Sequence, residues 1–228
     1  MDEGFKKTPQ PVSHGVNTSL QTIYAEHHKT NRERGFSIMK NERGLAIKNI
    51  VGDGKEVLDI GCRDGALTSF FSKSNKVLGV DIDETALSEA KANLGIEIMK
   101  IDLNGDWKEL GDKKFDVVVA GEVLEHLYNP DSVTRKISSH LNSGGKLVGS
   151  VPNAFSLKNR LRYLIGQKKY TPLSDPTHIN QFHTEELRNI LKKSFDKVEI
   201  VGLGKYKKLA KFSPNLFGFD LFFICTKK

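Results

Sequence analysis

The sequence has few cysteines, no long apolar run and no apolar segment near its start. Its two cysteines, Cys62 and Cys225, are far apart and lack the spacing of a metal site, so no disulfide is expected. No stretch approaches the roughly 18 apolar residues of a transmembrane helix, and the opening MDEGFKKTPQ lacks the apolar core of a secretory signal. These absences predict a cytoplasmic protein without a transmembrane segment.

Acidic residues are missing from two basic segments. Residues 154–170 carry five lysines and arginines and residues 205–211 carry four lysines, while the whole chain has a formal net charge of +7. Such segments are typical of a solvated surface or of a surface that contacts an anionic molecule. Aromatic residues are not interleaved with them as in nucleic-acid modules, so nucleic acid is not an expected partner.

The 228 residues suffice for one large α/β domain. Residues 1–24 are polar and predict a loose segment, and residues 25–228 are expected to form a single domain. The expected strands are 56–61, 76–81, 96–102, 114–121, 146–153, 198–201 and 220–226, and the expected helices are 25–51, 66–72, 84–94, 130–141 and one with Thr184 as its N-cap. This alternation predicts a parallel, doubly wound sheet whose ligand lies at the carboxyl ends of the strands.

The segment VLDIGCRDGALT, residues 57–68, reads as a buried strand followed by a glycine turn. Gly61 and Gly65 remove side chains where a ligand approaches the backbone. The dinucleotide pattern G-x-G-x-x-G is absent, because Arg63 occupies the place of its second glycine and Ala66 follows Gly65. An NAD-dependent oxidoreductase is therefore disfavoured.

Two carboxylates follow the next strands. Asp81 ends a strand about twenty positions after Gly61, where a carboxylate accepts both hydroxyls of a ribose. Asp102 follows the third strand in KIDLN, and GEVLEHL follows the fourth. With these motifs in order, the chain resembles the class I S-adenosylmethionine-dependent methyltransferases, in particular the ubiquinone-biosynthesis type, over about residues 45–227.

The resemblance implies a Rossmann-like fold with a seven-stranded, mostly parallel sheet, helices on both faces and a C-terminal antiparallel hairpin. It implies S-adenosylmethionine as cofactor and S-adenosylhomocysteine as product. The cofactor-binding residues would be Asp59, Gly61, Cys62, Gly65, Asp81, Ile82, Asp102, Leu103, Gly121 and Glu122. Asp81 would bind the ribose, Asp102 and Leu103 the adenine, and Glu122 the methionine end. Arg63 departs from the family's middle glycine.

The motif E-x-x-E-H places Glu122, Glu125 and His126 at helical spacing on one face. It resembles the metal-binding motif of ubiquinone-biosynthesis O-methyltransferases and small-RNA 2′-O-methyltransferases, with His178 as the closing ligand. The favoured interpretation has no metal: Glu125 and His126 then bond to loops under the cofactor. In that case His126 or His178 serves as a general base.

The connection at about 154–183 is long for a strand-to-helix link and predicts a lid-like insert. Leu157, Leu161 and Leu164 form a helical stripe that would cover the pocket. Asn153 would face the transferred methyl group. The tentative substrate residues are Asn153, Arg160, Arg162 and His183, with the arginines meeting phosphate or carboxylate.

The leading hypothesis is a methyltransferase acting on an oxygen or nitrogen of a small anionic acceptor, such as a sugar, lipid or quinone precursor. Two alternatives stay open: a non-catalytic S-adenosylmethionine-binding regulator or activator of the same fold, and an RNA 2′-O-methyltransferase. Either a monomer or a homodimer is compatible with the sequence.

Overall fold

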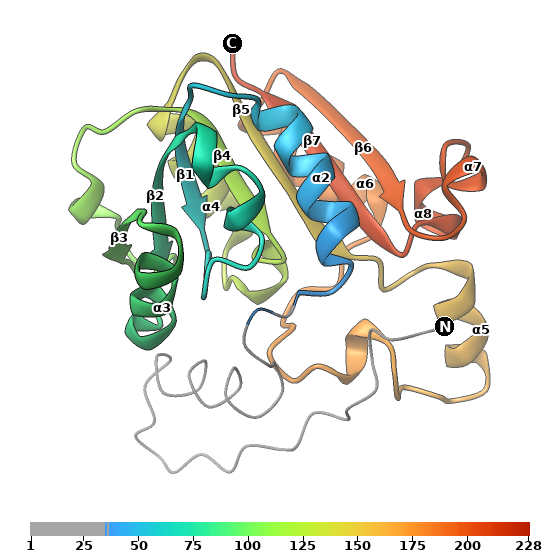
Figure 1. Cartoon of the computed structure of the whole chain (residues 1–228). Coiled ribbons are helices and arrows are strands. Elements are labelled where there is room, and N and C mark those ends of the chain that lie inside the picture. Colours follow the sequence, from blue (N-terminus) through green and yellow to red (C-terminus); the bar gives the residue numbers. More distant parts are fainter. Residues whose placement is uncertain (1–34, 36) are drawn as a thin grey trace.

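The computed structural model describes residues 35 and 37–228, which contain a seven-stranded sheet in the order β3-β2-β1-β4-β5-β7-β6 (Figure 1). Strands β1 to β5 run parallel, and β7 runs antiparallel to both β5 and β6. The strands are β1 Glu56–Ile60, β2 Lys76–Asp81, β3 Glu97–Lys100, β4 Phe115–Gly121, β5 Leu141–Pro152, β6 Lys197–Leu203 and β7 Asp220–Thr226. The predicted mostly parallel sheet with a C-terminal antiparallel hairpin is confirmed.

Helices cover both faces of the sheet. The α-helices are α2 Lys40–Val51, α3 Glu84–Leu94, α4 Pro130–His140, α5 Leu157–Leu164, α6 Thr184–Lys192, α7 Lys207–Ala210 and α8 Pro214–Phe217. The 3₁₀ turns are η1 Thr68–Phe70, η2 Ser72–Ser74, η3 Lys108–Leu110, η4 Leu124–His126 and η5 Pro172–Ser174. No helix of the described residues is both long and apolar enough to cross a bilayer.

The core lies in two layers, because the central strands are buried on both sides. In β4, Val118 packs in one apolar cluster, whereas Val117 and Val119 pack in the other. The first cluster includes apolar residues of α4 and α6, and the second includes residues of α2 and α3. The sheet therefore lies between two helical layers.

Helix ends follow the expected local chemistry in three cases. The Asp83 carboxylate accepts hydrogen bonds from the N–H groups of Thr85 and Ala86 at the start of α3. Gly95 ends α3 in the left-handed conformation. At α4, Asn129 is the N-cap and Pro130 is the first helical residue.

Three helix predictions need correction. The helix expected at 66–72 is replaced by η1 and η2, because hydroxyl side chains bond locally: Ser69 Oγ donates to the Ala66 carbonyl and Thr68 Oγ1 to Asp59. The helix expected at 25–51 begins at Lys40, and its part over 25–34, like the segment 1–24, lies outside the described residues. The N-cap of α6 is His183 instead of Thr184.

Candidate functional site

Three adjoining cavities lie at the carboxyl ends of the strands, and Glu122 lines all of them. The strand-end cavity, about 110 Å³, is bounded by the ends of β1, β2 and β4. The turn cavity, about 50 Å³, lies against the loop after β1. The α5 cavity, about 320 Å³, is lined by residues of α5, η5 and the start of β7. Glu122 follows β4 directly and is the point where the three meet.

Nine of the ten predicted cofactor residues line the two smaller cavities. The strand-end cavity has Gly61, Asp81, Ile82, Asp102, Leu103, Gly121 and Glu122, and the turn cavity adds Asp59 and Cys62. The exception is Gly65, which lines neither. A Cβ atom at Gly65 would lie 2.5 Å from Leu94 Cδ1, so this glycine permits close packing against α3. The expected approach of Gly65 to a ligand is thus replaced by a packing role.

Asp81 fixes the backbone around the strand-end cavity. Its Oδ2 accepts a hydrogen bond from the Arg63 N–H at 2.9 Å, and its Oδ1 accepts one from the Asp83 N–H at 3.0 Å. Asp81 also lines the strand-end cavity. The carboxylate therefore orients the glycine turn beside the cavity.

The loop after β3, which carries Asp102 and Leu103, is held by its own side chains. Asp102 Oδ1 accepts a hydrogen bond from the Asn104 N–H at 2.9 Å, and the Leu103 carbonyl accepts one from the Trp107 indole at 3.0 Å. Trp107 is buried in the core. This anchoring fixes Asp102 and Leu103 at the rim of the strand-end cavity.

Asp59 is buried in β1 beneath the turn cavity. Thr68 Oγ1 donates a hydrogen bond of 2.6 Å to its Oδ2. Burial raises the pKa of Asp59 to about 7; the Thr68 hydrogen bond opposes this rise, and the Asp81 charge adds to it. The carboxyl group therefore changes its charge near neutral pH, where a cationic group in the cavity would favour the ionised form.

Two non-glycine residues beside the cavities adopt left-handed backbone angles. Arg63 has φ of 51° and Glu122 has φ of 62°. Such conformations are costly for residues with side chains and concentrate at functional sites. Arg63 thus takes the backbone conformation that a glycine would adopt there, while its guanidinium lies 3.8 Å from Asp64. Arg63 lines both smaller cavities.

A buried charge cluster forms one side of the α5 cavity. Arg43 of α2 lies 3.7 Å from Glu122 and 3.7 Å from Asp220, and all three residues are buried. Burial raises the pKa of Asp220 well above its usual range, the Glu122 charge raises it further, and Arg43 opposes the rise. Sequence reasoning missed Arg43 and Asp220. The helical spacing of Arg43 and Ile47 placed both on the buried face of α2 and could have indicated the arginine.

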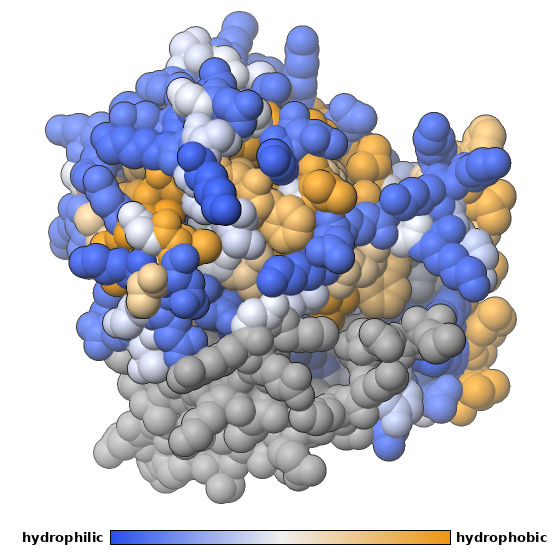
Figure 2. Space-filling view, viewed as in Figure 1, coloured by the Kyte–Doolittle hydropathy of each residue, from blue (hydrophilic) through white to orange (hydrophobic). Residues whose placement is uncertain are grey.

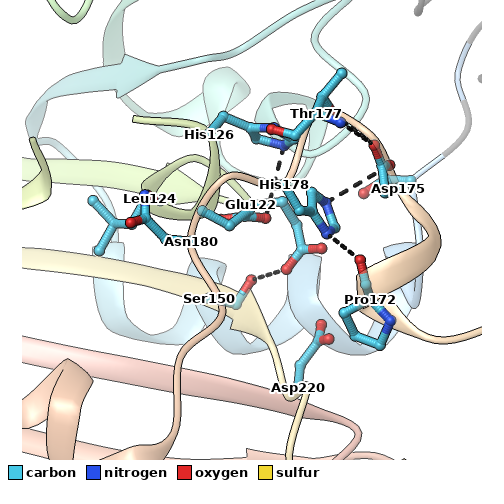
Figure 3. Close-up of polar contacts among 12 residues, drawn as sticks. Glu122, Leu124, His126, Ser150, Pro172, Asp175, Thr177, His178, Asn180 and Asp220 are labelled. Carbon is cyan, nitrogen blue, oxygen red and sulfur yellow. Dashed lines mark hydrogen bonds and ion pairs between the residues drawn. The ribbon is translucent and has the colours of Figure 1, made fainter. Parts of the chain in front are cut away.

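The predicted metal-motif residues are only partly brought together. Ligand atoms of Glu125, His126 and His178 lie within 4.8 Å of one another. Glu122 is directed elsewhere, because Ser150 Oγ donates to its Oε1 at 3.3 Å and Arg43 lies beside it (Figure 3). The structure therefore groups one carboxylate with two imidazoles and excludes Glu122 from that group.

Both imidazoles are oriented by backbone carbonyls. His126 Nδ1 lies 2.9 Å from the Thr177 carbonyl oxygen, and His178 Nδ1 lies 3.1 Å from that of Pro172 (Figure 3). Because a carbonyl only accepts hydrogen bonds, each Nδ1 carries the proton, and the neutral ring has its lone pair on Nε2. His178 lines the α5 cavity and His126 lines the strand-end cavity.

The tentative substrate residues behave differently from one another. Arg162 lines the α5 cavity, whereas Arg160 does not and donates to the Phe155 carbonyl. His183 caps α6, with its Nδ1 accepting from the Glu185 N–H. These contacts give Arg160 and His183 structural roles and leave Arg162 beside the cavity.

Asn153 lines none of the three cavities. It is fully buried, and its Nδ2 donates to the carbonyls of Asn215 and Gly218 at 2.9 Å each. Its Oδ1 accepts from the Phe155 N–H at 3.1 Å. The amide is thus engaged in joining β5 to the segment before β7, which corrects the expected role in substrate contact.

The insert after β5 lines the α5 cavity, but with the opposite face from the one expected. Ser156, Asn159 and Arg162 face the cavity. The leucine stripe is exposed: Leu161 is 57% and Leu164 is 81% accessible. The apolar side of α5 therefore points away from the cavity it was expected to cover.

Comparisons with known proteins agree with this geometry. A family model described as a methyltransferase domain matches residues 34–194, which is more than half of the chain. The chain therefore belongs to this methyltransferase domain family.

Two curated relatives have names that state a cofactor or an acceptor. A probable S-adenosylmethionine-dependent methyltransferase of Mycobacterium tuberculosis is 31% identical over 135 residues, covering 58% of this chain and 43% of the relative. A ubiquinone biosynthesis O-methyltransferase of Stutzerimonas stutzeri is 34% identical over 136 residues, covering 56% of this chain and 59% of the relative. The match thus spans about half the length of these relatives.

Solved structures share the fold at lower identity. An S-adenosylmethionine-dependent methyltransferase from Thermotoga maritima has a TM-score of 0.64 at 19% identity and covers 92% of this chain and 96% of its own. One from Archaeoglobus fulgidus has a TM-score of 0.62 at 24% identity, with coverages of 90% and 99%. These likenesses establish the Rossmann-like methyltransferase fold.

Proposed function

We propose that the chain transfers a methyl group from S-adenosylmethionine to an oxygen or nitrogen of a small anionic acceptor. The observation that carries this proposal is the position of Glu122, which lines two cavities shaped by the predicted cofactor residues and a third, larger one. A donor bound in the first two and an acceptor in the third would meet at this residue. Residues 25–228 would act as one catalytic domain.

The cofactor would extend across the two smaller cavities. Asp81 would accept hydrogen bonds from the ribose hydroxyls, and Asp102 would accept one from the adenine amino group. Ile82 and Leu103 would pack against the adenine ring. The methionine end would lie in the turn cavity near Gly61 and Asp59. The carboxyl group of Asp59 supports this orientation, because a buried carboxylate is stabilised by the cofactor's α-ammonium group.

The acceptor would occupy the α5 cavity. Lys158 and Arg162 line it and attract an anionic group. His178 lines the same cavity, and its Nε2 lies 3.7 Å from Asp175 Oδ2, which would stabilise the ring once it takes the proton that an acceptor hydroxyl loses on methylation. Because the sulfonium donor is already activated, most of the rate would come from holding donor and acceptor in line.

Calorimetric titration with S-adenosylhomocysteine tests the cofactor assignment. Wild type should bind, and Asp102→Asn should weaken binding by about tenfold through loss of the adenine contact. Asp106→Asn is the matched control, since Asp106 lies in the same loop but pairs with Lys108 outside the cavities. No binding by wild type, or equal affinities for Asp102→Asn and wild type, would contradict the proposal.

A turnover assay distinguishes a methyltransferase from a non-catalytic regulator of the same fold. Wild type would be incubated with methyl-labelled S-adenosylmethionine and anionic sugar, lipid and quinone-precursor acceptors. Label transfer that His178→Gln abolishes supports the methyltransferase. Tight cofactor binding with no transfer to any acceptor would favour the non-catalytic alternative.

A metal-assisted form of the reaction is a second candidate. Two imidazoles and one carboxylate suit a divalent transition metal, and the carbonyls bound to both Nδ1 atoms provide the outer contacts that such ligands usually have. Glu125, His126 and His178 would hold the ion, which would lower the pKa of an acceptor hydroxyl.

Titration with Mn²⁺ distinguishes the two forms. Saturable binding that His178→Ala weakens at least about tenfold would support the metal-assisted form. His140→Ala is the matched control, because His140 also lies 2.9 Å from a backbone carbonyl but outside the cluster. Absence of Mn²⁺ binding in wild type would leave His178 as a proton acceptor.

A further inference from the structure

Exposed apolar side chains gather on one edge of the molecule. Among the described residues, eight of the eleven large apolar side chains that are exposed lie in two short segments. They are Leu157, Leu161, Leu164, Ile165 and Tyr170 around α5, and Tyr206, Leu209 and Phe212 around α7. These eight residues, together with the lysines and arginines of 158–169 and 205–211, are here called the α5–α7 surface.

The two segments belong to one region of the fold. Helix α8 contacts both α5 and α7, and Figure 1 places the three helices along the same edge. Figure 2 shows apolar side chains among hydrophilic ones along that edge. The most protruding are Phe212, 88% exposed, and Leu164, 81% exposed. Single exposed leucines are ordinary, whereas a gathering of this kind marks an interaction surface.

The two segments of this surface carry charge of one sign, and Lys207 pairs with Glu42 of α2 at 2.8 Å. Residues 154–170 and 205–211 contain nine lysines and arginines and no acidic residue. Lys208 and Lys211 are exposed on either side of Leu209, and Lys169 lies over the Tyr170 ring. Long cationic side chains can extend to a phosphate layer while neighbouring leucines enter an apolar phase.

We infer that the α5–α7 surface docks on an anionic lipid bilayer. Phe212, Leu164 and Ile165 would enter the boundary between headgroups and acyl chains, and the lysines would contact anionic headgroups. A second copy of the chain fits less well, because two such surfaces would bring like charges together. Nucleic acid fits less well, because aliphatic side chains predominate over stacking aromatics.

The surface adjoins the proposed acceptor cavity. Lys158, Arg162 and Tyr170 line that cavity, and they belong to the segment that carries the exposed leucines. The surface therefore continues into the cavity. If the proposed function holds, the acceptor is an amphiphilic molecule that reaches the cavity from the bilayer. Docking itself does not depend on methyl transfer and can be measured without cofactor.

Vesicle flotation tests the inference on the full chain. Wild type should float with vesicles of phosphatidylcholine and phosphatidylglycerol and not with phosphatidylcholine alone, and high salt should weaken the binding. The double variants Leu164→Ser/Phe212→Ser and Lys208→Glu/Lys211→Glu should each lower the partition coefficient by at least about tenfold.

Matched controls change equivalent residues elsewhere. Leu45→Ser removes a leucine that is 54% exposed on α2, and Lys48→Glu/Lys91→Glu reverses two exposed charges on α2 and α3. Both should bind vesicles within about twofold of wild type. Circular dichroism establishes that every variant is folded.

Five outcomes would overturn the inference. These are no flotation of wild type with anionic vesicles, equal losses in the control variants, and equal binding by wild type and the leucine–phenylalanine variant. The fourth is concentration-dependent dimerisation in ultracentrifugation that the surface variants abolish, without vesicle binding; it would assign the surface to a second copy of the chain. The same variants abolishing binding to an RNA oligonucleotide, with no flotation, would also overturn it.

Discussion

Arg43 of α2 and Asp220 of β7 face each other at 3.7 Å, and each side chain is only 1% exposed. The Asp220 carboxylate accepts no hydrogen bond from the described residues. The guanidinium, which also lies 3.7 Å from Glu122, is therefore the group that favours the ionised form of Asp220 against the effect of burial. Through this contact a helix near the start of the described chain becomes part of the proposed acceptor site.

Arg43→Met should destabilise the fold by about 3–5 kcal/mol, because it removes the buried cation that lies beside both Glu122 and Asp220. Asp220→Asn should cost less, since burial already favours the uncharged form of Asp220. Urea unfolding measures both. Arg135→Met is the control and should stay within about 0.5 kcal/mol of wild type, as Arg135 is exposed on α4. A loss for Arg43→Met no larger than that of the control would contradict the role of the cluster.

The raised pKa of Asp59 should make the free energy of unfolding fall as pH rises. Its folded pKa of about 7 lies above the unfolded value near 4, so the folded chain holds the proton more tightly across this window. Below about pH 4 the contribution is constant, and it is lost as pH rises through 7. Relative to wild type, Asp59→Asn should therefore gain thermal stability between about pH 5 and pH 7.5, measured as the difference in Tm.

Asp116→Asn is a control for which the pH dependence of stability has the opposite sign. Hydrogen bonds from the Glu56 N–H and from Asn142 lower the pKa of Asp116. Its contribution is thus present above the unfolded pKa and is lost as pH falls through the lower folded value. A Tm difference for Asp59→Asn that does not change with pH would contradict the shifted pKa.

Gly65→Ala and Gly54→Ala separate packing from backbone strain. Both glycines have positive φ, 80° and 69°, but an added Cβ meets Leu94 at 2.5 Å at Gly65 and nothing within 4 Å at Gly54. Gly54→Ala should cost about 1 kcal/mol and Gly65→Ala about 1–3 kcal/mol more. Equal losses in urea unfolding would show that α3 does not restrict this turn.

Asn153→Ala should lower the free energy of unfolding by about 1–3 kcal/mol, because buried carbonyls of the segment before β7 lose their donor. Asn142→Ala is the control, since Asn142 is exposed and bonds only to Asp116 among the described residues; it should cost within about 0.5 kcal/mol. A stable Asn153→Ala variant that lost only acceptor affinity would restore the substrate role expected from the sequence.

Much of the fold could be predicted because its signals are local. Asp83 and Asn129 cap helices through bonds to N–H groups a few residues away, and the buried strands show as apolar runs. The residues around the strand ends could be placed for a related reason. Parallel strands bring their carboxyl ends to one edge, so Gly61, Asp81 and Asp102 gather there wherever the strand order is right.

The incorrect or missing predictions concern contacts between residues that are far apart in the sequence. Arg43 and Asp220 lie at opposite ends of the described sequence, and no local pattern pairs them. Asn153 has the residue type of a substrate ligand, but its partners are carbonyls of Asn215 and Gly218. In α5 the leucine spacing indicated an apolar face correctly, whereas the direction of that face depends on Asn159, which is buried and bonds back to the Asn153 carbonyl.

The arrangement of the three cavities bears on kinetic order. The α5 cavity is bounded by α5, η5 and β7, whereas the other two lie against the ends of β1, β2 and β4, and Glu122 is common to all. In the proposed reaction each ligand therefore has its own approach, and neither must bind first to form the other's site. Steady-state rates should then follow a random sequential scheme, in which spent cofactor can leave and be replaced while the acceptor side is still occupied.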